Sequence, residues 1–315
     1  MLKTAFLYDP AFLKHQTGWA HPEKRQRLTA LLNHLKKKGL WNQFLHLPTQ
    51  PAPIDAITAI HTVSYVDQLR LTCGTGKLFQ PDEATLGSPG TYEAALMAAG
   101  AVLAALDAVM QQQAQNAFCA VRPPGHHALP DRAMGFCFFN NVAIGARYLQ
   151  QRYGLHKIAI IDWDIHHGNG TQQAFYNDPS VFYFSLHQES LYPPHSGQAA
   201  ETGEGVGEGY TLNVPMPPGA SDADYQQAFA QKLIPAMASF QPEFILISAG
   251  FDGHRDDQLA QAKLTEQGFA KLTQRVMTLA REYCERRLVS VLEGGYSLSG
   301  LTASVEAHLR VLAEC

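Results

Sequence analysis

The sequence predicts an α/β fold in which helices cover both faces of a central, mainly parallel, multi-stranded sheet. Three observations predict it. Short apolar runs rich in β-branched and aromatic residues recur along the chain, as in strands buried on both faces. Segments with helical character lie between many of these runs. Several runs end in polar clusters, and parallel α/β sheets bind ligands beyond the carboxyl ends of their strands.

The predicted strands share a length of six to nine residues and an almost continuous apolar character. Runs of this length are too short for most core helices, and their Val, Ile, Phe and Tyr content favours strands. They span residues 4–9, 116–123, 157–164, 180–187, 210–216, 243–250 and 287–295.

The predicted helices are longer and carry start and stop signals. Segment 21–39 opens with Pro-Glu and closes with lysines and Gly, in accord with the helix dipole. Segment 88–112 is rich in Ala, and segment 221–240 starts with a cap-like Ser-Asp pair. Segments 265–286 and 299–314 complete the set.

The composition is that of a globular protein with a large core, since 46% of the 315 residues are hydrophobic and 17% are charged. The net charge of −4 gives no basic footprint, so we expect no direct binding to nucleic acid. No apolar stretch approaches the about 20 residues of a membrane span, so we expect no membrane partner. No repeat or linker divides the chain, and we expect a single domain over residues 1–315.

The amino-terminal apolar run is too short for a signal peptide and has no small-residue cleavage site. The cysteines are scattered, odd in number and form no Cys-x-x-Cys pair, which favours free thiols in a reducing compartment. We therefore expect a cytoplasmic protein. The Gly-rich segment 196–209 is predicted to be a long loop that can pack at the interface of a homo-oligomer. The cysteines are Cys73, Cys119, Cys137, Cys284 and Cys315.

Five predicted strands end in polar motifs, and these motifs predict one shared site. The motifs read RPPGHH, DWDIHHGNG, SLHQ, SAGFDGHRDD and EGGY in chain order. Because the carboxyl ends of parallel strands meet at one edge of a sheet, we expect the side chains of all five motifs to converge there.

The motif DWDIHHGNG supplies candidate metal ligands. In an extended strand, Asp162, Asp164 and His166 would point to one side and His167 to the other. With Asp252 from another strand end, one His and two carboxylates form a hydrolytic metal site, for which Zn²⁺ fits best and Fe²⁺ or Co²⁺ is also accepted. Taken alone, Asp252 would be interpreted as a turn or helix cap. His167 is predicted to serve packing.

The motifs RPPGHH and EGGY supply groups for proton transfer and charge stabilisation. The prolines and Gly125 of RPPGHH hold His126 and His127 rigidly, and adjacent imidazoles beside a metal suit proton transfer. The alternative is a second metal site. Tyr296 follows two glycines and can donate a hydrogen bond to a developing oxyanion. Its alternative is an aromatic side chain that packs on the surface.

Together these motifs resemble the zinc-dependent histone deacetylases of the arginase-deacetylase fold, nearest their class II and bacterial amidohydrolase branch. The resemblance begins at HPEKRQR and extends through GFCFFNNVAI and DWDIHHGNGTQ to EGGY. It implies a hydrolase that removes acetyl or other acyl groups from the ε-amine of lysine in proteins or peptides. It also implies that Asp164, His166 and Asp252 hold Zn²⁺, which activates a water.

The resemblance assigns the catalytic roles as well. His127 would be the general base and later the acid that protonates the leaving amine, oriented by Asn169. His126, oriented by Asp162, would assist electrostatically, and Tyr296 would polarise the acetyl carbonyl. Class I members carry Asp where this chain has Asn169, so HHGNG points to the class II-like branch.

A narrow tunnel for the apolar lysine stem is also implied by the resemblance. Many relatives have Phe where this chain has Tyr192. Asp82 would bind the substrate backbone, with Glu83 as its competitor for that role. The residues expected along the tunnel are Gly135, Phe136, Tyr192 and Leu259.

The family also binds structural potassium, and two sets of positions match. The inner set is Asp162, Asp164, His166, Ser185 and Leu186, mostly through main-chain oxygens. The outer set is Phe175, Asp178, Val181 and Tyr210.

Three other functions remain open at this point. The first is a deacetylase of small amides such as acetylpolyamines; relatives of that kind place an acidic group at the tunnel mouth, where this chain has Leu259, or shape the mouth by dimerisation. A non-catalytic acyl-lysine-binding scaffold would not need the complete set of catalytic-type residues. An arginase-like enzyme with two Mn²⁺ ions would use more carboxylates.

Overall fold

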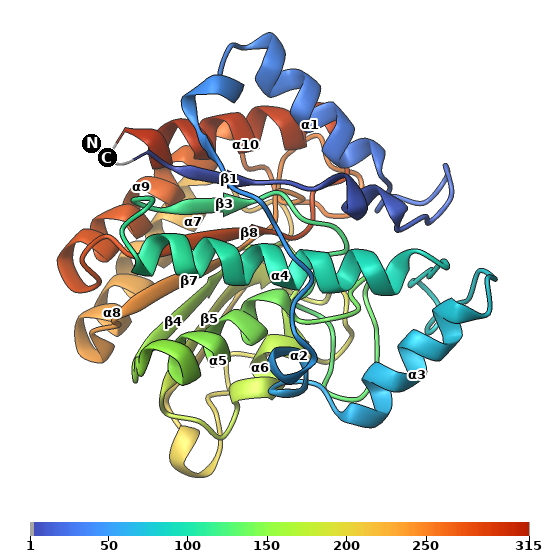
Figure 1. Cartoon of the computed structure of the whole chain (residues 1–315). Coiled ribbons are helices and arrows are strands. Elements are labelled where there is room, and N and C mark those ends of the chain that lie inside the picture. The colour runs from blue at the N-terminus through green and yellow to red at the C-terminus, as the bar shows by residue number, and fades with distance from the viewer. Residues whose placement is uncertain (1–2, 315) are drawn as a thin grey trace.

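The computed structural model describes residues 3–314, and its centre is one eight-stranded sheet (Figure 1). The strand order is β2-β1-β3-β8-β7-β4-β5-β6, and every pair of neighbours is parallel. Figure 1 shows α4 and α5 in front of the sheet and α9 and α10 behind it. The predicted α/β class is therefore confirmed. The strands are β1 Ala5–Leu7, β2 Leu45–His46, β3 Ala117–Cys119, β4 Ile158–Asp162, β5 Val181–Gln188, β6 Thr211–Met216, β7 Phe244–Ala249 and β8 Leu288–Leu292.

The helices cover both faces of the sheet because the strands are apolar on both sides, and β4, β5 and β7 are buried at every residue. The α-helices are α1 Gln26–Lys37, α2 Ile54–Thr58, α3 Val63–Gly74, α4 Thr91–Met110, α5 Asn141–Tyr153, α6 Asn169–Phe175, α7 Asp222–Ala228, α8 Ile234–Phe240, α9 Glu266–Tyr283 and α10 Leu298–Ala313. Short helical turns are η1 Pro10–Lys14, η2 Trp41–Gln43, η3 Gly205–Gly207 and the π-helical η4 Phe229–Leu233.

Strand register brings the polar strand ends together. Asp162 at the end of β4 pairs with Ser185 of β5 on one side and with Ser248 of β7 on the other. Ser248 in turn pairs with Val291 of β8. The segments that follow β4, β7 and β8 therefore leave the sheet side by side at one edge.

Two predicted helices differ from the structure. The first begins at Gln26, because residues 21–25 form bends and a turn in which Glu23 is buried and its carboxylate binds Arg122. The segment predicted over 221–240 is divided by the π-helical η4. Pro235, which has no N–H to donate, follows this interruption at the start of α8.

Five elements were absent from the prediction: β2, α2, α3, α5 and α6. They are short or begin with residues that favour turns. Helix α6 opens with Gly168 and Asn169, which indicate a turn in sequence. Helix α5 begins after Asn140, whose side chain accepts a hydrogen bond from the N–H of Ala143.

Helix α4 corrects one expectation. An 18-residue window of this 20-residue helix has a mean hydropathy of 1.7, so by length and composition the helix is apolar enough to span a membrane. However, 72% of this stretch is buried inside the protein, as in a core helix, with Ala98, Val102 and Leu106 fully enclosed. The same burial explains its all-round apolar character.

The four cysteines in the described part of the chain, Cys73, Cys119, Cys137 and Cys284, are free and buried, as predicted. Cys315 lies outside the described residues.

Candidate active site

The polar strand ends meet at a cavity of about 230 Å³ at the carboxyl edge of the sheet. Three of the five predicted motifs line it, through His127, His166 and Tyr296, and Asp252 of a fourth motif lies within ligand distance of His166, whereas no residue of SLHQ lines it. Its lining consists of Ala84, His127, Gly135, Phe136, His166, Leu191, Tyr192, Leu259 and Tyr296.

His166 lines this cavity, and together with the buried Asp164 and Asp252 it forms a candidate metal centre. One ligand atom from each lies within 4.8 Å of the others. Nδ1 of His166 lies 3.1 Å from Oδ1 of Asp164 and 3.1 Å from Oδ2 of Asp252. An imidazole and two carboxylates are ligands that Zn²⁺ accepts, with a fourth position left for water or substrate.

Backbone contacts fix this arrangement, and strand alternation does not. Strand β4 ends at Asp162, so Asp164 and His166 lie in the irregular segment beyond it, contrary to the predicted strand over 157–164. The N–H of His166 donates to Oδ1 of Asp164 at 2.9 Å, and the N–H of Ile165 donates to Oδ1 of Asp252 at 3.0 Å. The sequence pattern grouped the right side chains by strand alternation, whereas in the structure backbone hydrogen bonds beyond the end of β4 hold them in place.

Two glycines allow the backbone to approach the carboxylates. A Cβ on Gly250 would lie 2.1 Å from Oδ2 of Asp164, and a Cβ on Gly294 would lie 2.1 Å from Oδ2 of Asp252. The N–H of Gly294 donates to Oδ2 of Asp164 at 2.8 Å. The donor set is therefore oriented by contacts that only glycine permits.

The charges around this centre favour a cation. Burial disfavours the charged imidazolium of His166, but Asp164 and Asp252 outweigh burial and raise the pKa of His166 to about 10. Burial and the charge of Asp164 raise the pKa of Asp252 to about 6. Three buried ligands with an excess of negative charge fit a divalent metal ion.

The two adjacent histidines have opposite electrostatic environments. Nδ1 of His126 lies 3.0 Å from Oδ2 of Asp162, and although burial opposes the cation, Asp162 and Asp164 raise the pKa of His126 to about 10. Burial, together with the charges of His126 and His166, holds the pKa of His127 well below its usual value. His127 is thus a neutral imidazole beside a cationic one, the arrangement expected of a base next to an electrostatic assistant.

Asn169 fixes the tautomer of His127. Its Oδ1 lies 2.9 Å from Nδ1 of His127, while its Nδ2 donates toward Sδ of Met134 at 3.4 Å. The amide therefore presents its oxygen to the ring, so Nδ1 of His127 carries the hydrogen and Nε2 is the free base.

Tyr296 lines the same cavity as His127. Its N–H donates to Oδ2 of Asp257 at 2.6 Å, and the Arg27 guanidinium lies 5.0 Å from its ring centroid. Burial and the charge of Asp252 raise the pKa of Tyr296 well above its usual value. The phenol therefore keeps its proton at neutral pH and can donate it in a hydrogen bond.

The four residues expected along the tunnel line this cavity. Tyr192 packs edge-on against His127 with ring centroids 5.1 Å apart, and Phe136 packs edge-on against Tyr296 at 5.8 Å. Both walls are aromatic, and Leu259 is 37% exposed at the rim. Such a narrow apolar channel accommodates an extended alkyl chain.

Asp82 stands beside this channel, whereas Glu83 is exposed. One oxygen of Asp82 accepts from the N–H groups of Ala84 and Thr85, and the other accepts from the N–H of Gly135 at 3.1 Å. The Asp82 carboxylate thus ties the 82–85 turn to the tunnel wall.

His167 turns away from the metal centre, as predicted. Its Nδ1 lies 2.7 Å from Oγ of Ser196, and its Nε2 lies 2.9 Å from Oε1 of Gln172. It packs against His187 under the 196–209 loop. These contacts hold that loop against the body of the protein.

Sequence reasoning missed several residues that hold the site. Arg27 donates to the carbonyls of Gly295 and Glu293, and Glu293 accepts from the loop that bears the two histidines. Ala84 and Leu191 line the cavity without having been predicted to do so. In the sequence, only the positions of Arg27 and Glu293 within the motifs HPEKRQR and EGGY indicated a role for them. Their hydrogen-bond partners lie far away in the sequence.

The positions matched to potassium also lie close to one another. Asp162 pairs with Ser185 in the sheet, and its Oδ1 accepts from the N–H of Asp164. In the outer set, the N–H of Asp178 donates to the carbonyl of Phe175, and its carboxylate accepts from Arg147 at 2.6 Å.

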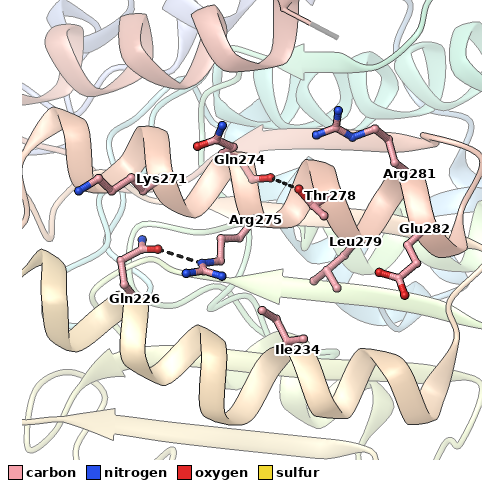
Figure 2. Close-up of a pocket in the computed structure, with 9 residues that line it drawn as sticks. All are labelled: Gln226, Ile234, Lys271, Gln274, Arg275, Thr278, Leu279, Arg281 and Glu282. Atoms are coloured by element: carbon pink, nitrogen blue, oxygen red, sulfur yellow. Dashed lines mark hydrogen bonds between the residues drawn. The ribbon is translucent and has the colours of Figure 1, made fainter.

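A larger groove, of about 550 Å³, lies elsewhere, between α9 and the helices α7 and α8 (Figure 2). Figure 2 shows Arg275 reaching Gln226, a hydrogen bond of 3.1 Å, with the apolar side chain of Ile234 below it and that of Leu279 to its right. Its lining contains no His or Cys and only one carboxylate, that of Glu282. Its size therefore does not make it the reaction site.

Comparisons with known proteins support the sequence resemblance. Residues 21–312 match the family model described as the histone deacetylase domain. The chain is 40% identical to a probable deacetylase of Archaeoglobus fulgidus, covering 94% of this chain and 82% of that protein. It is 36% identical to a histone deacetylase-like amidohydrolase of Pseudomonas aeruginosa, covering 99% and 90%.

Two further comparisons concern substrate and fold. The human polyamine deacetylase HDAC10 is 40% identical over 96% of this chain and 47% of its own length. The crystal structure of the HDA15 HD domain superposes with a TM-score of 0.93 at 35% identity, covering 99% of this chain and 88% of that one.

Proposed function

The chain belongs to the histone deacetylase family, and from that premise we propose that it is a zinc-dependent hydrolase that removes acetyl groups from the ε-amine of lysine in proteins or peptides. One observation carries the proposal. A buried centre of Asp164, His166 and Asp252 lies at the end of an aromatic channel, directly beside the neutral imidazole of His127. A non-catalytic scaffold would have no need for this combination.

Asp164, His166 and Asp252 would hold Zn²⁺, because two carboxylates and one imidazole are a ligand set that this ion accepts in hydrolytic sites. The ion would supply Lewis acidity toward the amide carbonyl and would acidify the attacking water. A two-manganese centre is disfavoured, because His126 is already engaged by Asp162 and the remaining carboxylate, Glu293, accepts backbone N–H groups.

His127 provides the proton transfers. Its Nε2 accepts the proton of the attacking water, because Nδ1 is committed to Asn169. The water oxygen bonds to the carbonyl carbon, the carbon–nitrogen bond then breaks, and His127 returns the proton to the departing amine. The cationic His126 beside it, held by Asp162, stabilises the negative charge that develops.

Tyr296 provides the second stabilising contact. Its hydroxyl, which stays protonated, donates a hydrogen bond to the developing oxyanion. Arg27 and Asp257 hold the main chain of this loop, so the hydroxyl is positioned before the substrate binds.

A second candidate function is the deacetylation of acetylpolyamines, which the similarity to the human polyamine deacetylase favours. Against it stands Leu259, an apolar residue at the rim that offers no partner to the distal ammonium of a polyamine. We therefore propose acyl-lysine, ahead of acetylpolyamines, as the preferred substrate.

The two candidates are separated by measuring kcat/KM on an acetyl-lysine peptide and on acetylspermidine, each with and without a chelator. We expect the peptide to be preferred, activity to vanish on chelation and one equivalent of Zn²⁺ to restore it. Preference for acetylspermidine would support the second function. An enzyme that is inert on both, with zinc bound, would support the scaffold.

We also propose that potassium binds behind the centre through Asp162, Asp164, His166, Ser185 and Leu186. Support comes from the sheet register that pairs Asp162 with Ser185. Phe175, Asp178, Val181 and Tyr210 form the weaker outer candidate, because the Asp178 carboxylate already binds Arg147. Activity measured in potassium and in a bulky organic cation at equal ionic strength tests both.

A further inference from the structure

Glu293 is a buried carboxylate to which neither the metal centre nor the proton transfers assign a role. It directly follows β8, and its side chain is fully enclosed. Its Oε2 accepts from the N–H of Gly125 at 2.7 Å and from the N–H of His126 at 3.2 Å. A third contact, from Oγ of Ser248 to Oε1, is longer at 3.4 Å. The side chain therefore holds the backbone of the loop that carries both histidines.

The main chain of Glu293 belongs to the opposite loop, which carries Tyr296. Its carbonyl accepts from Arg27 at 2.5 Å, and the next residue, Gly294, donates its N–H to Asp164. One residue thus connects the histidine loop, the tyrosine loop and a candidate metal ligand. The two loops are 168 positions apart at Gly125 and Glu293.

Burying a carboxylate is costly unless hydrogen bonds and charge compensate it. Glu293 receives both, since two backbone N–H groups point at one oxygen and the cationic His126 lies next to it. Without an acceptor here, those two N–H groups would be buried and unpaired, which favours a shift of the histidine loop. An apolar residue at position 293 would fill the space but leave the two N–H groups without an acceptor.

We propose that Glu293 is a positioning residue: its carboxylate fixes the histidine loop against the tyrosine loop, so that His127 and Tyr296 both act on the same carbonyl group of the substrate. The inference rests on the proposed function. Displacement of a reacting group by about 1 Å can cost ~100-fold in rate, so a small movement of the loop is enough to be measured.

The test compares Glu293→Met with Glu293→Gln, two side chains of similar length that differ in whether they can accept a hydrogen bond. Turnover, KM and zinc content are measured with an acetyl-lysine peptide. For Glu293→Met we expect kcat to fall about 100-fold with KM and zinc content close to the wild type, because the tunnel walls and Asp164, His166 and Asp252 stay in place. Glu293→Gln keeps an acceptor and should retain at least about a tenth of kcat.

The matched control is Ser248→Ala, which removes the 3.4 Å contact and leaves both backbone contacts intact. It should behave like the wild type. If Glu293→Met does not fold, Glu293→Asp replaces it: the carboxylate is one methylene shorter, cannot reach both N–H groups, and should lose about tenfold in kcat.

Three results would overturn the inference. They are a normal kcat in Glu293→Met or Glu293→Asp, a rise in KM or a fall in zinc content that accounts for the whole loss of activity, and equal losses in the Met and Gln variants. A wild-type enzyme inert on every acyl-lysine substrate would overturn the proposed function and this inference with it. An active wild type with an equally active Met variant would overturn the inference alone.

Discussion

The side-chain oxygen of Asn169 lies 2.9 Å from Nδ1 of His127, and a neutral amide therefore orients the candidate base. Asn169 is the first residue of α6, and His127 belongs to the loop after β3, so two elements distant in sequence define this contact. A neutral partner orients the ring without adding negative charge. Burial and the cationic neighbours can then keep His127 unprotonated.

Replacing Asn169 with Asp should raise the pKa of His127, because a carboxylate at 2.9 Å stabilises the imidazolium. The base must be neutral to accept a proton, so the acidic limb of the kcat/KM profile should move to higher pH. Asn169→Ala, which removes orientation without adding charge, should lower kcat and leave the limb in place. An unshifted limb in Asn169→Asp would mean that His127 is not the group that titrates.

Tyr296→Phe should bind the acyl-lysine substrate with a KM near that of the wild type and turn over at least ~100-fold more slowly, since one oxyanion donor is lost. Tyr192→Phe is the matched control, because it removes a hydroxyl from the same cavity and keeps the aromatic wall. Steady-state kinetics on one peptide compares them. Near-normal turnover in Tyr296→Phe would remove this hydroxyl from the mechanism.

Leu259→Glu should increase kcat/KM for acetylspermidine and decrease it for acetyl-lysine peptides. Leu259 lies at the partly exposed rim, where a carboxylate would pair with the distal ammonium of a polyamine. Leu259→Gln, of equal size and without charge, separates the electrostatic effect from the loss of apolar contact. The idea fails if the Glu and Gln variants show the same ratio of activities on the two substrates.

Conformational stability should fall as the pH decreases from about 6.5 to about 4. Burial lowers the pKa of His61 to about 4, and its Nε2 accepts the N–H of Asn140, so protonation is unfavourable in the folded state. The unfolded chain then binds more protons across this window, and the free energy of unfolding rises with pH by up to ~1.4 kcal/mol per pH unit for this group.

Urea unfolding of His61→Gln across the same pH range measures this contribution. The slope of the free energy of unfolding against pH should be smaller than in the wild type by the amount that one proton contributes, up to ~1.4 kcal/mol per pH unit. His156→Gln, at an exposed position, is the control and should leave the slope unchanged. An equal slope in all three proteins would show that His61 is not titrating on unfolding.

The amino-acid sequence by itself determined the fold class and the chemical groups of the site. The strands that it predicted are present because a run such as Ile158–Asp162 is apolar enough to be buried on both faces. The groups Asp164, His166 and Asp252 were identifiable because each belongs to a polar motif directly after such a run, and parallel strands end at a common edge. Helix α6 was missed, because local Gly and Asn signals favour a turn, whereas in the folded chain this segment packs against β5 and α5.

Only the tertiary structure decided how these groups are held and charged. His126 and His127 are neighbours in sequence, yet one is cationic and the other neutral, because Asp162 and Asn169 reach them from elsewhere in the chain. Asp164 and His166 share a ligand site through backbone hydrogen bonds beyond the end of β4. The links from Arg27 and Glu293 cross more than 160 positions. Protonation and orientation depend on burial and on partners brought close by folding, and a sequence pattern contains neither quantity.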